Sequence, residues 1–324
     1  MSNNSKWRQT LKFAAAFILL LLVNFMLPRL LPGDPLLVFY GEEAVTDFTP
    51  AAREALIVKM HLNAPLGEQF IKYIAGVVCL DFGYSYHHGR QVLDLILDFA
   101  PWTMALTGLT LIFSTLLAAF ASLRGAWDEG GRFDRGTISF FMILNCIPPF
   151  ILAMLLLRTF AITFDFFPLS GGCSIFLPQT ACGRLADLAW HAVLPVASLM
   201  LHEVPNQFLL LRAEALRWKG KPFVSVFLAK GIHPRTIKYK HLLLCITPAV
   251  FARVGKSVAA LMGGAMFVEI VFTYPGLGLL VFESLQTHDY PTVQGVMLTI
   301  GSCTLLFNFM ADLVNDSLLH RISS

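Results

Sequence analysis

Six long apolar stretches are separated by polar segments along this 324-residue chain. Each stretch can form a helix that crosses a hydrocarbon core of about 30 Å, which takes about 20 apolar residues. The stretches cover residues 11–31, 101–123, 138–164, 191–216, 242–273 and 292–319. The pattern therefore predicts an all-α membrane protein with six transmembrane helices.

The first stretch has a basic start, so it could also be a cleavable signal peptide. We favour a retained anchor, because the apolar run is long for a signal and no small-x-small cleavage site follows before Pro28. The loop at 32–100 is too long for a turn, and short helices are predicted at 50–60 and 69–78. We therefore divide the chain into a tail and first helix (1–31), an external loop (32–100) and a five-helix core (101–324).

Composition excludes an ordinary soluble domain, since 56% of the residues are hydrophobic, 14% are charged and the mean hydropathy is +0.66. Charge gives the orientation, because cytoplasmic loops are enriched in Lys and Arg. The segment at 212–241 has one acid, Glu214, against Arg212, Arg217, Lys219, Lys221, Lys230, Arg235, Lys238 and Lys240. The N-terminal tail and the 124–135 loop also carry basic residues, whereas acids outnumber Lys and Arg at 32–100 and 165–190. Alternate crossings then place both termini and the 212–241 segment in the cytoplasm.

Residues 223–241, FVSVFLAKGIHPRTIKYKH, interrupt the apolar pattern between the fourth and fifth spans. Gly231 allows a tight turn or a positive φ between two short helices, and Pro234 suits the first turn of the second helix. His233 and the lysines can then face an acidic partner. The segment predicts a docking surface on the inner side of the membrane; a positive-inside loop without a partner is the alternative.

Short motifs lie at or near the ends of the apolar stretches. They are Pro32-Gly33-Asp34-Pro35, Asn63-Ala64-Pro65-Leu66 with Gln69-Phe70, Leu80-Asp81-Phe82-Gly83-Tyr84-Ser85, Ile147-Pro148-Pro149-Phe150, Phe167-Pro168-Leu169-Ser170-Gly171, His191-Ala192-Val193-Leu194-Pro195, Tyr274-Pro275-Gly276-Leu277-Gly278 and Asp289-Tyr290-Pro291-Thr292-Val293-Gln294-Gly295. In this order and topology, the chain resembles nearly end to end the inner-membrane permeases of ATP-binding-cassette importers. The resemblance is to the branch that handles dipeptides, oligopeptides and nickel.

The resemblance implies that the segment at 217–241 contains a coupling helix, which sits in a groove of a separate ATPase subunit. The residues expected to couple to the ATPase are Ala229, Lys230, Gly231, Pro234, Arg235, Lys240 and His241. Ser225 and Phe227 depart from the family pattern, which has Glu at the first position and a small residue at the second. These departures leave docking as the expectation but not its individual contacts.

The resemblance also implies partners in a bacterial inner membrane: a second homologous permease, ATPase subunits and an external substrate-binding protein. The chain has no G-x-x-x-x-G-K-[ST] loop for phosphates and no G-x-S-x-G or H-E-x-x-H pattern, so we expect neither an enzyme nor a bound cofactor. Peptides and nickel or other metal chelates both stay open as cargo. An ion-driven secondary transporter, which would more often show an internal repeat, and a membrane assembly protein are the alternatives.

Polar residues inside a span are costly and therefore suggest function. The candidates for a translocation pathway are Met200, His202, Glu203, Asn206 and Glu269. At helical spacing His202 shares a face with Asn206, and Glu203 shares one with Gln207. The alternative is that these side chains only satisfy a helix kinked at Pro205.

The remaining candidates are cysteines and histidines of the external loops. Cys173 and Cys182 could form a disulfide in an oxidising compartment, with Cys79 as a competing partner. His61, His87 and His88 lie near acids, but their spacing is not that of metal ligands, so we predict no metal site.

Overall fold

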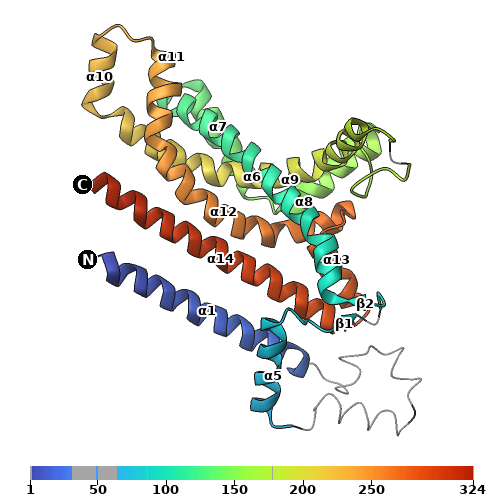
Figure 1. Ribbon diagram of the computed structural model, residues 1–324. Helices are drawn as coiled ribbons and strands as arrows, with labels where there is room; N and C mark the ends of the chain where they lie inside the picture. Colours follow the sequence, from blue (N-terminus) through green and yellow to red (C-terminus); the bar gives the residue numbers. More distant parts are fainter. Residues whose placement is uncertain (1, 31–48, 50–63, 86, 177, 324) are drawn as a thin grey trace. The chain divides into compact units, whose positions relative to one another are not determined.

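The computed structural model describes residues 2–30, 49, 64–85, 87–176 and 178–323 (Figure 1). The helix expected at 50–60, the motif at 32–35 and His61 lie outside these residues. The described part is almost entirely helical, as the all-α prediction requires. Its only strands are β1 (Tyr84–Ser85) and β2 (Arg90–Gln91), which form a small antiparallel hairpin.

Five of the six expected spans are continuous helices that are long and apolar enough to cross a membrane. They are α1 (Ser2–Leu30), α6 (Val92–Trp127), α9 (Ala181–Lys219), α12 (Leu243–Phe272) and α14 (Tyr290–Ser323). Length and composition give five spans among the described residues, or six if one bent helix pair is counted as a span.

The third expected span is that bent pair, so the prediction of one helix over 138–164 is wrong. The chain forms α7 (Arg132–Asn145), then α8 (Pro149–Leu156) continued by a π-helical turn, η1 (Leu157–Thr163), with a bend of 100° between the two parts. Pro148 has an extended backbone, with ψ 145°, and neither it nor Pro149 has an amide hydrogen to donate. The Ile147-Pro148-Pro149 motif therefore ends one helix and starts the next.

Shorter elements fill the segments between the spans. They are α5 (Leu66–Val78), α10 (Pro222–Ala229), α11 (Pro234–Thr236), the π-helical η2 (Ile237–Leu242) and α13 (Leu277–Gln286). The short helix predicted at 69–78 is confirmed as α5.

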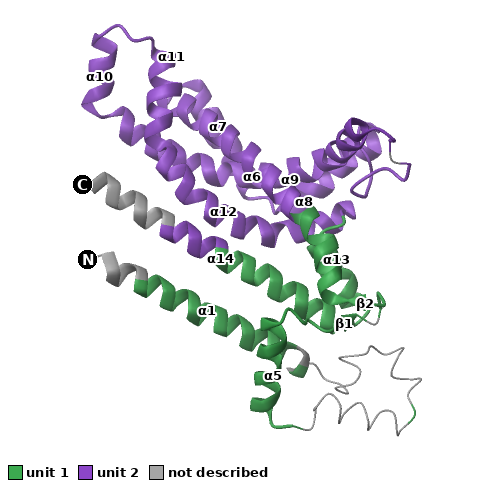
Figure 2. Ribbon diagram, viewed as in Figure 1, with its two compact units in different colours: residues 1–103, 275–306 green, residues 104–274, 307–324 purple. Residues whose placement is uncertain are grey.

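The chain forms two compact units (Figure 2). Unit 1 comprises Met1–Thr103 and Pro275–Leu306. Within it, Asn24 Nδ2 donates to the Gln294 carbonyl at 3.0 Å and Gln294 Nε2 donates to the Asn24 carbonyl at 2.7 Å. A Cβ added to Gly301 would come within 2.8 Å of the Leu20 side chain, so glycine permits close packing of α1 and α14.

Unit 2 comprises Met104–Tyr274 and Phe307–Ser324, with α9 packed against α7, α8 and α12. Its first apolar cluster includes Phe141 of α7, Leu152 of α8 and Phe208 of α9. The rings of Phe141 and Phe208 meet edge to face, with centroids 4.9 Å apart. A second cluster lies where α9 ends and α12 begins, and it supports the segment that the sequence singled out.

Candidate functional site

A glycine turn joins α10 to α11, beyond the end of α9 (Figure 1). Gly231 has φ +76°, which L residues rarely adopt. Its amide donates to the Leu228 carbonyl at 3.0 Å, and the Ile232 amide donates to the Phe227 carbonyl at 3.0 Å, which closes α10. Pro234 begins α11, where no amide donor is needed. The two short helices and the glycine turn expected from the sequence are therefore present.

The apolar side of this segment is anchored inside unit 2. Its second apolar cluster contains Leu123, Ala126, Ala215, Val224, Ile237, Leu242 and Ile246, all buried. Phe227 packs against this cluster, and its ring centroid lies 4.5 Å from that of His241. Phe227, which departs from the expected small residue, and His241 thus contribute to internal packing.

Three of the eight basic residues at 212–241 form hydrogen bonds or ion pairs within unit 2, and a fourth, half-buried Lys238, lies over the Tyr239 ring. Arg212 donates from Nε and Nη2 to the two carboxylate oxygens of buried Asp134, both at 2.6 Å. Lys219 Nζ donates to the last carbonyls of α6, those of Ala126 at 2.9 Å and Trp127 at 2.8 Å. Arg217 pairs with Glu214 of the same helix at 2.6 Å.

Other cations around the turn remain on the surface. The exposed ones are Lys221, Lys230, Arg235 and Lys240. His233 is also exposed, but its Nδ1 accepts a hydrogen bond from the Arg235 amide at 3.2 Å and so caps α11. We call Lys221, Lys230, Arg235 and Lys240 the basic rim. Sequence alone did not separate the rim from the internally engaged cations.

Two of the polar residues of the fourth span, Glu203 and Gln207, form a buried cluster with two other helices. Glu203 is 2% exposed, and its Oε1 accepts hydrogen bonds from Ser257 Oγ of α12 at 2.5 Å and from Gln207 Nε2 at 3.1 Å. Gln207 Nε2 also lies 3.4 Å from Ser114 Oγ of α6. Arg253 Nη2 of α12 lies 3.8 Å from Glu203 Oε1. Three helices therefore share one intramembrane hydrogen-bond network.

The other pathway candidates have different surroundings. Met200 packs against the first apolar cluster. His202 and Asn206 are half-buried and share a face, since Asn206 Nδ2 donates to the His202 carbonyl at 3.2 Å. Glu269 is fully buried, 12 residues beyond Ser257 on α12, which is about 18 Å along the helix. The structure thus brings Glu203 and Gln207 together and leaves Glu269 apart from them.

The sequence analysis missed Arg253 and Lys256, two basic residues inside the apolar fifth span. They are visible in the sequence as the only strong bases between His241 and Pro275. Arg253 reaches the Glu203 network, whereas Lys256 is exposed on unit 2. A charge count within the span, rather than a search for polar clusters, would have found them.

The C-terminal end of α12 is tied to the loop at 165–180. The Gly171 amide donates to the Phe272 carbonyl at 2.9 Å, and the Tyr274 amide donates to the Glu269 carbonyl at 2.8 Å. Burial, with smaller contributions from Glu269 and Cys173, raises the pKa of Tyr274 to about 12. The motif at 167–171 therefore packs at this end of α12.

The disulfide considered for Cys173 and Cys182 is not seen in the structure, which has both as free thiols. The loop after Cys173 is held by Asp187, which accepts hydrogen bonds from the Ser174 amide at 2.8 Å and Ser174 Oγ at 2.5 Å. Cys182 lies in the first turn of α9, five residues before Asp187, which is about 7.5 Å along the helix. This anchoring places Ser174, the residue after Cys173, beside the second turn of α9.

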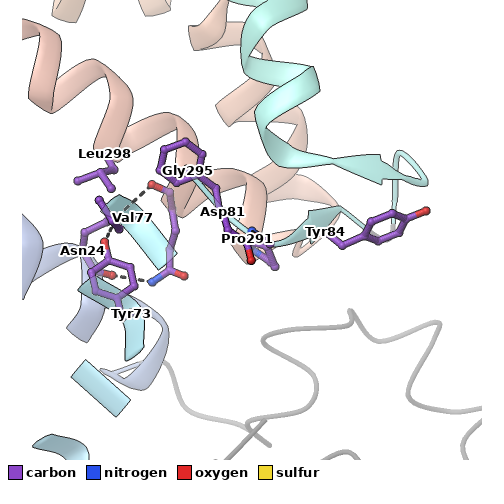
Figure 3. A pocket seen from close by; sticks show the side chains of 11 residues that line it. Asn24, Tyr73, Val77, Asp81, Tyr84, Pro291, Gly295 and Leu298 are labelled. Atoms are coloured by element: carbon purple, nitrogen blue, oxygen red, sulfur yellow. Dashed lines mark hydrogen bonds between the residues drawn. The ribbon is translucent and has the colours of Figure 1, made fainter. Parts of the chain in front are cut away.

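Two of the sequence motifs, at 80–85 and 289–295, meet in unit 1. Asp289 Oδ2 accepts hydrogen bonds from Ser85 Oγ at 2.5 Å and from Thr292 Oγ1 at 2.7 Å, and His88 Nδ1 lies 3.8 Å away. Residues of both motifs, with Asn24 and Tyr73, line a pocket of about 230 Å³ (Figure 3). Burial raises the pKa of the Tyr73 phenol, which accepts a hydrogen bond from Asn24 Nδ2 at 2.9 Å. Through the part of the chain that the structure describes, no three His, Cys, Asp or Glu side chains gather as metal ligands.

Comparison with known proteins agrees with this architecture. The chain is 30% identical over 298 residues to the probable peptide ABC transporter permease protein y4tP of Sinorhizobium fredii, covering 92% of each chain. It is 29% identical over 309 residues to the oligopeptide transport system permease protein OppB of Haemophilus influenzae, covering 95% of each. It is 26% identical over 328 residues to the dipeptide transport system permease protein DppB of Escherichia coli, covering 94% of this chain and 95% of that protein.

A family description also matches residues 114–324, which is well over half of the chain. This range contains the first apolar cluster of unit 2, the intramembrane network and the basic rim. The chain belongs to the family of binding-protein-dependent transport system inner membrane components, and is a multi-pass permease of a bacterial inner membrane.

Proposed function

We propose that this permease carries peptides through the inner membrane and docks through α10, the Gly231 turn and α11 onto a separate ATPase subunit. The complete importer would contain a second homologous permease and an external peptide-binding protein. Peptide cargo is supported by the three relatives described above, whose names specify peptides, oligopeptides or dipeptides. None of those three names specifies nickel.

The main support for the docking proposal is the surface of α10, the Gly231 turn and α11. This surface packs on the second apolar cluster and still exposes its charged side chains. The basic rim has exposed cations on both sides of the turn in sequence, and Val226 and Leu228 of α10 remain about half exposed, at 48% and 46%. Exposed apolar side chains together with exposed cations suit a protein–protein contact. The candidates Ala229, Lys230, Gly231, Pro234, Arg235 and Lys240 are all exposed, and half-buried His241 supports the surface from beneath.

The same anchoring gives a route for coupling. The second apolar cluster joins α10 and η2 to α6, α9 and α12, so displacement of the turn must displace the ends of three spans. ATP-driven closure of the partner would pull the turn and favour the outward-open state. The partner shifts this equilibrium only as far as it binds one state more tightly than the other.

The test is recovery of the ATPase subunit with a tagged permease after co-expression. We expect Gly231→Asp to reduce recovery about tenfold or more and to abolish peptide uptake, because its carboxylate would face an acidic partner. Gly231→Asn has nearly the same shape without the charge and tolerates a positive φ, so it should retain most binding. Both variants should insert into the membrane at the parental level.

Gly130→Asp is the matched control. Gly130 has φ +72° and open space around its Cα, as Gly231 does, and it lies in the turn before α7. This variant carries the same backbone strain and the same charge outside the docking surface, so we expect normal recovery of the ATPase subunit. Docking at this turn is refuted if Gly231→Asp takes up peptide at the parental rate. It is also refuted if Gly231→Asp and Gly130→Asp lose recovery of the ATPase subunit equally.

A further inference from the structure

Lys256 lies near the middle of the α12 span. It is 13 residues from the first residue of α12 and 16 from the last, or about 20 Å and about 24 Å along the helix. A hydrocarbon core of about 30 Å therefore surrounds it whichever end of α12 lies at the membrane surface. Within unit 2 the side chain is exposed, and it forms no ion pair with another residue that the structure describes.

The neighbouring network cannot neutralise Lys256. Its single carboxylate, Glu203, is already engaged by Ser257 at 2.5 Å and Gln207 at 3.1 Å, and Arg253 lies 3.8 Å away. Arg253 Nε is itself buried without a hydrogen-bond partner among the described residues. When all three groups are ionised, one carboxylate faces two cations, so one positive charge of this network remains uncompensated. Asp312 of α14, next to Ala311, forms no ion pair with Lys256.

An ammonium group at this depth is too costly to face lipid and instead marks a water-filled path or a protein contact. The exposed face of α12 continues from Lys256 through Ala260 and Gly263, at the i, i+4 and i+7 positions. Ala260 and Gly263 are small, so the part of this face between Lys256 and exposed Phe267 leaves space for an extended chain to pass beside the charge.

We propose that Lys256 lines the translocation pathway and binds the C-terminal carboxylate of a passing peptide, with Arg253 as a second cation behind it. The inference rests on the peptide transport proposed above. Every unmodified linear peptide carries this one negative charge, whatever its sequence, which matches the single uncompensated positive charge of the site. Lysine suits a moving ligand, because its ammonium is a point charge on a flexible stem rather than a rigid bidentate fork.

Glu203 has a defined part in this arrangement. It holds Arg253 by electrostatic attraction and thereby limits the total positive charge that the carboxylate meets. A transport site must bind its cargo well enough to admit it and weakly enough to release it. One net charge, rather than two, satisfies both requirements.

The experiment uses the complete importer, with its binding protein, in proteoliposomes. Initial uptake of trialanine is compared with that of trialanine amide, each at a concentration shown by calorimetry to saturate the binding protein. We expect Lys256→Met to lower uptake of the free acid about tenfold, the effect of losing one charge-assisted hydrogen bond, and to leave amide uptake unchanged. Lys256→Arg should keep most uptake of the acid, and Lys72→Met, which removes an exposed lysine of α5, should change neither rate.

A second measurement does not require the binding protein to accept the amide. A Lys256→Cys variant is treated with a membrane-impermeant thiol reagent, and labelling of the parental chain with its six native cysteines is subtracted. We expect labelling that trialanine slows and trialanine amide does not. This labelling measurement still tests the carboxylate site if Lys256→Met fails to assemble.

The outcomes separate this inference from the proposal beneath it. If the parental importer moves no peptide, the proposed function fails. If it does, then equal uptake by Lys256→Met, equal losses for acid and amide, or failure of the Lys256→Cys variant to react with the reagent overturns only the carboxylate site. The last two results would assign Lys256 to an ion pair with the second permease.

Discussion

Two helices of unit 2 approach each other closely at Gly255 of α12. A Cβ built on Gly255 would overlap Ala311 Cβ of α14 and lie 3.1 Å from Ala311 Cα, whereas ordinary contacts fall at 3.4–4 Å. The obstacle is backbone and a methyl group, with no flexible end that could move aside. Gly255→Ala therefore forces the two helices apart by roughly 1.5 Å at this point.

The magnitude follows from two opposing terms. Overpacking of this kind costs about 1–3 kcal/mol, and the rigid obstacle places it in the upper half of that range. Replacing glycine by alanine inside a helix returns about 0.5–1 kcal/mol. We therefore expect the free energy of unfolding to fall by about 1–2.5 kcal/mol.

Gly263→Ala is the matched control on the same helix, because nothing lies within 4 Å of its built Cβ. It should gain about 0.5–1 kcal/mol from helix propensity alone. Both variants are compared with the parent as purified chains in detergent, by equilibrium unfolding in SDS followed through Trp fluorescence. If Gly255→Ala is as stable as Gly263→Ala, the close approach of α12 and α14 is refuted.

Two further predictions concern single side chains. Arg212→Ala leaves the Asp134 carboxylate buried without its cation and should lower the free energy of unfolding by about 3–5 kcal/mol. Arg217→Ala, which breaks an exposed pair with Glu214, should change the free energy of unfolding by less than about 1 kcal/mol. Equal effects in the same SDS titration would contradict the internal role of Arg212. Tyr274 has a pKa raised to about 12 from an ordinary value of 10.0, so the phenol is harder to ionise in the folded chain than in the unfolded one. The stability that this neutral group contributes is therefore complete below pH 10 and is lost as pH rises toward 12. Tyr274→Phe should lose less stability than the parent between about pH 9 and about pH 11, and parallel losses would show that this phenol is not linked to folding.

The spans could be predicted because membrane insertion depends on a local property of the sequence. A stretch of about 20 apolar residues is sufficient, so the apolar cores of five helices were found from hydropathy alone. The bend in the third stretch has an equally local cause, the two consecutive prolines at 148 and 149. It was missed because the apolar run continues across them, and length was given more weight than the missing amide donors.

The site could be predicted only in part, since its polar contacts join residues far apart in the chain. The positive φ of Gly231 could be predicted from the residue type, because few other residues adopt that φ. In contrast, the pairing of Arg212 with Asp134 spans 78 positions and that of Ser85 with Asp289 spans 204. No periodicity connects such partners, so their motifs were visible in the sequence while their contact was not.

The basic segment at 212–241 shows why a charge pattern has more than one physical cause. Arg212 bonds to Asp134 and Lys219 bonds to the carbonyls that end α6, so both residues join helices within unit 2. Lys230 and Arg235 lie beside the turn and bond to no acid among the described residues, so they remain available to a partner. Both groups satisfy the positive-inside rule equally well, and only their contacts distinguish them. The inferred role of Lys256 follows the same reasoning, because Glu203 is bonded within its own chain whereas Lys256 forms no ion pair among the described residues.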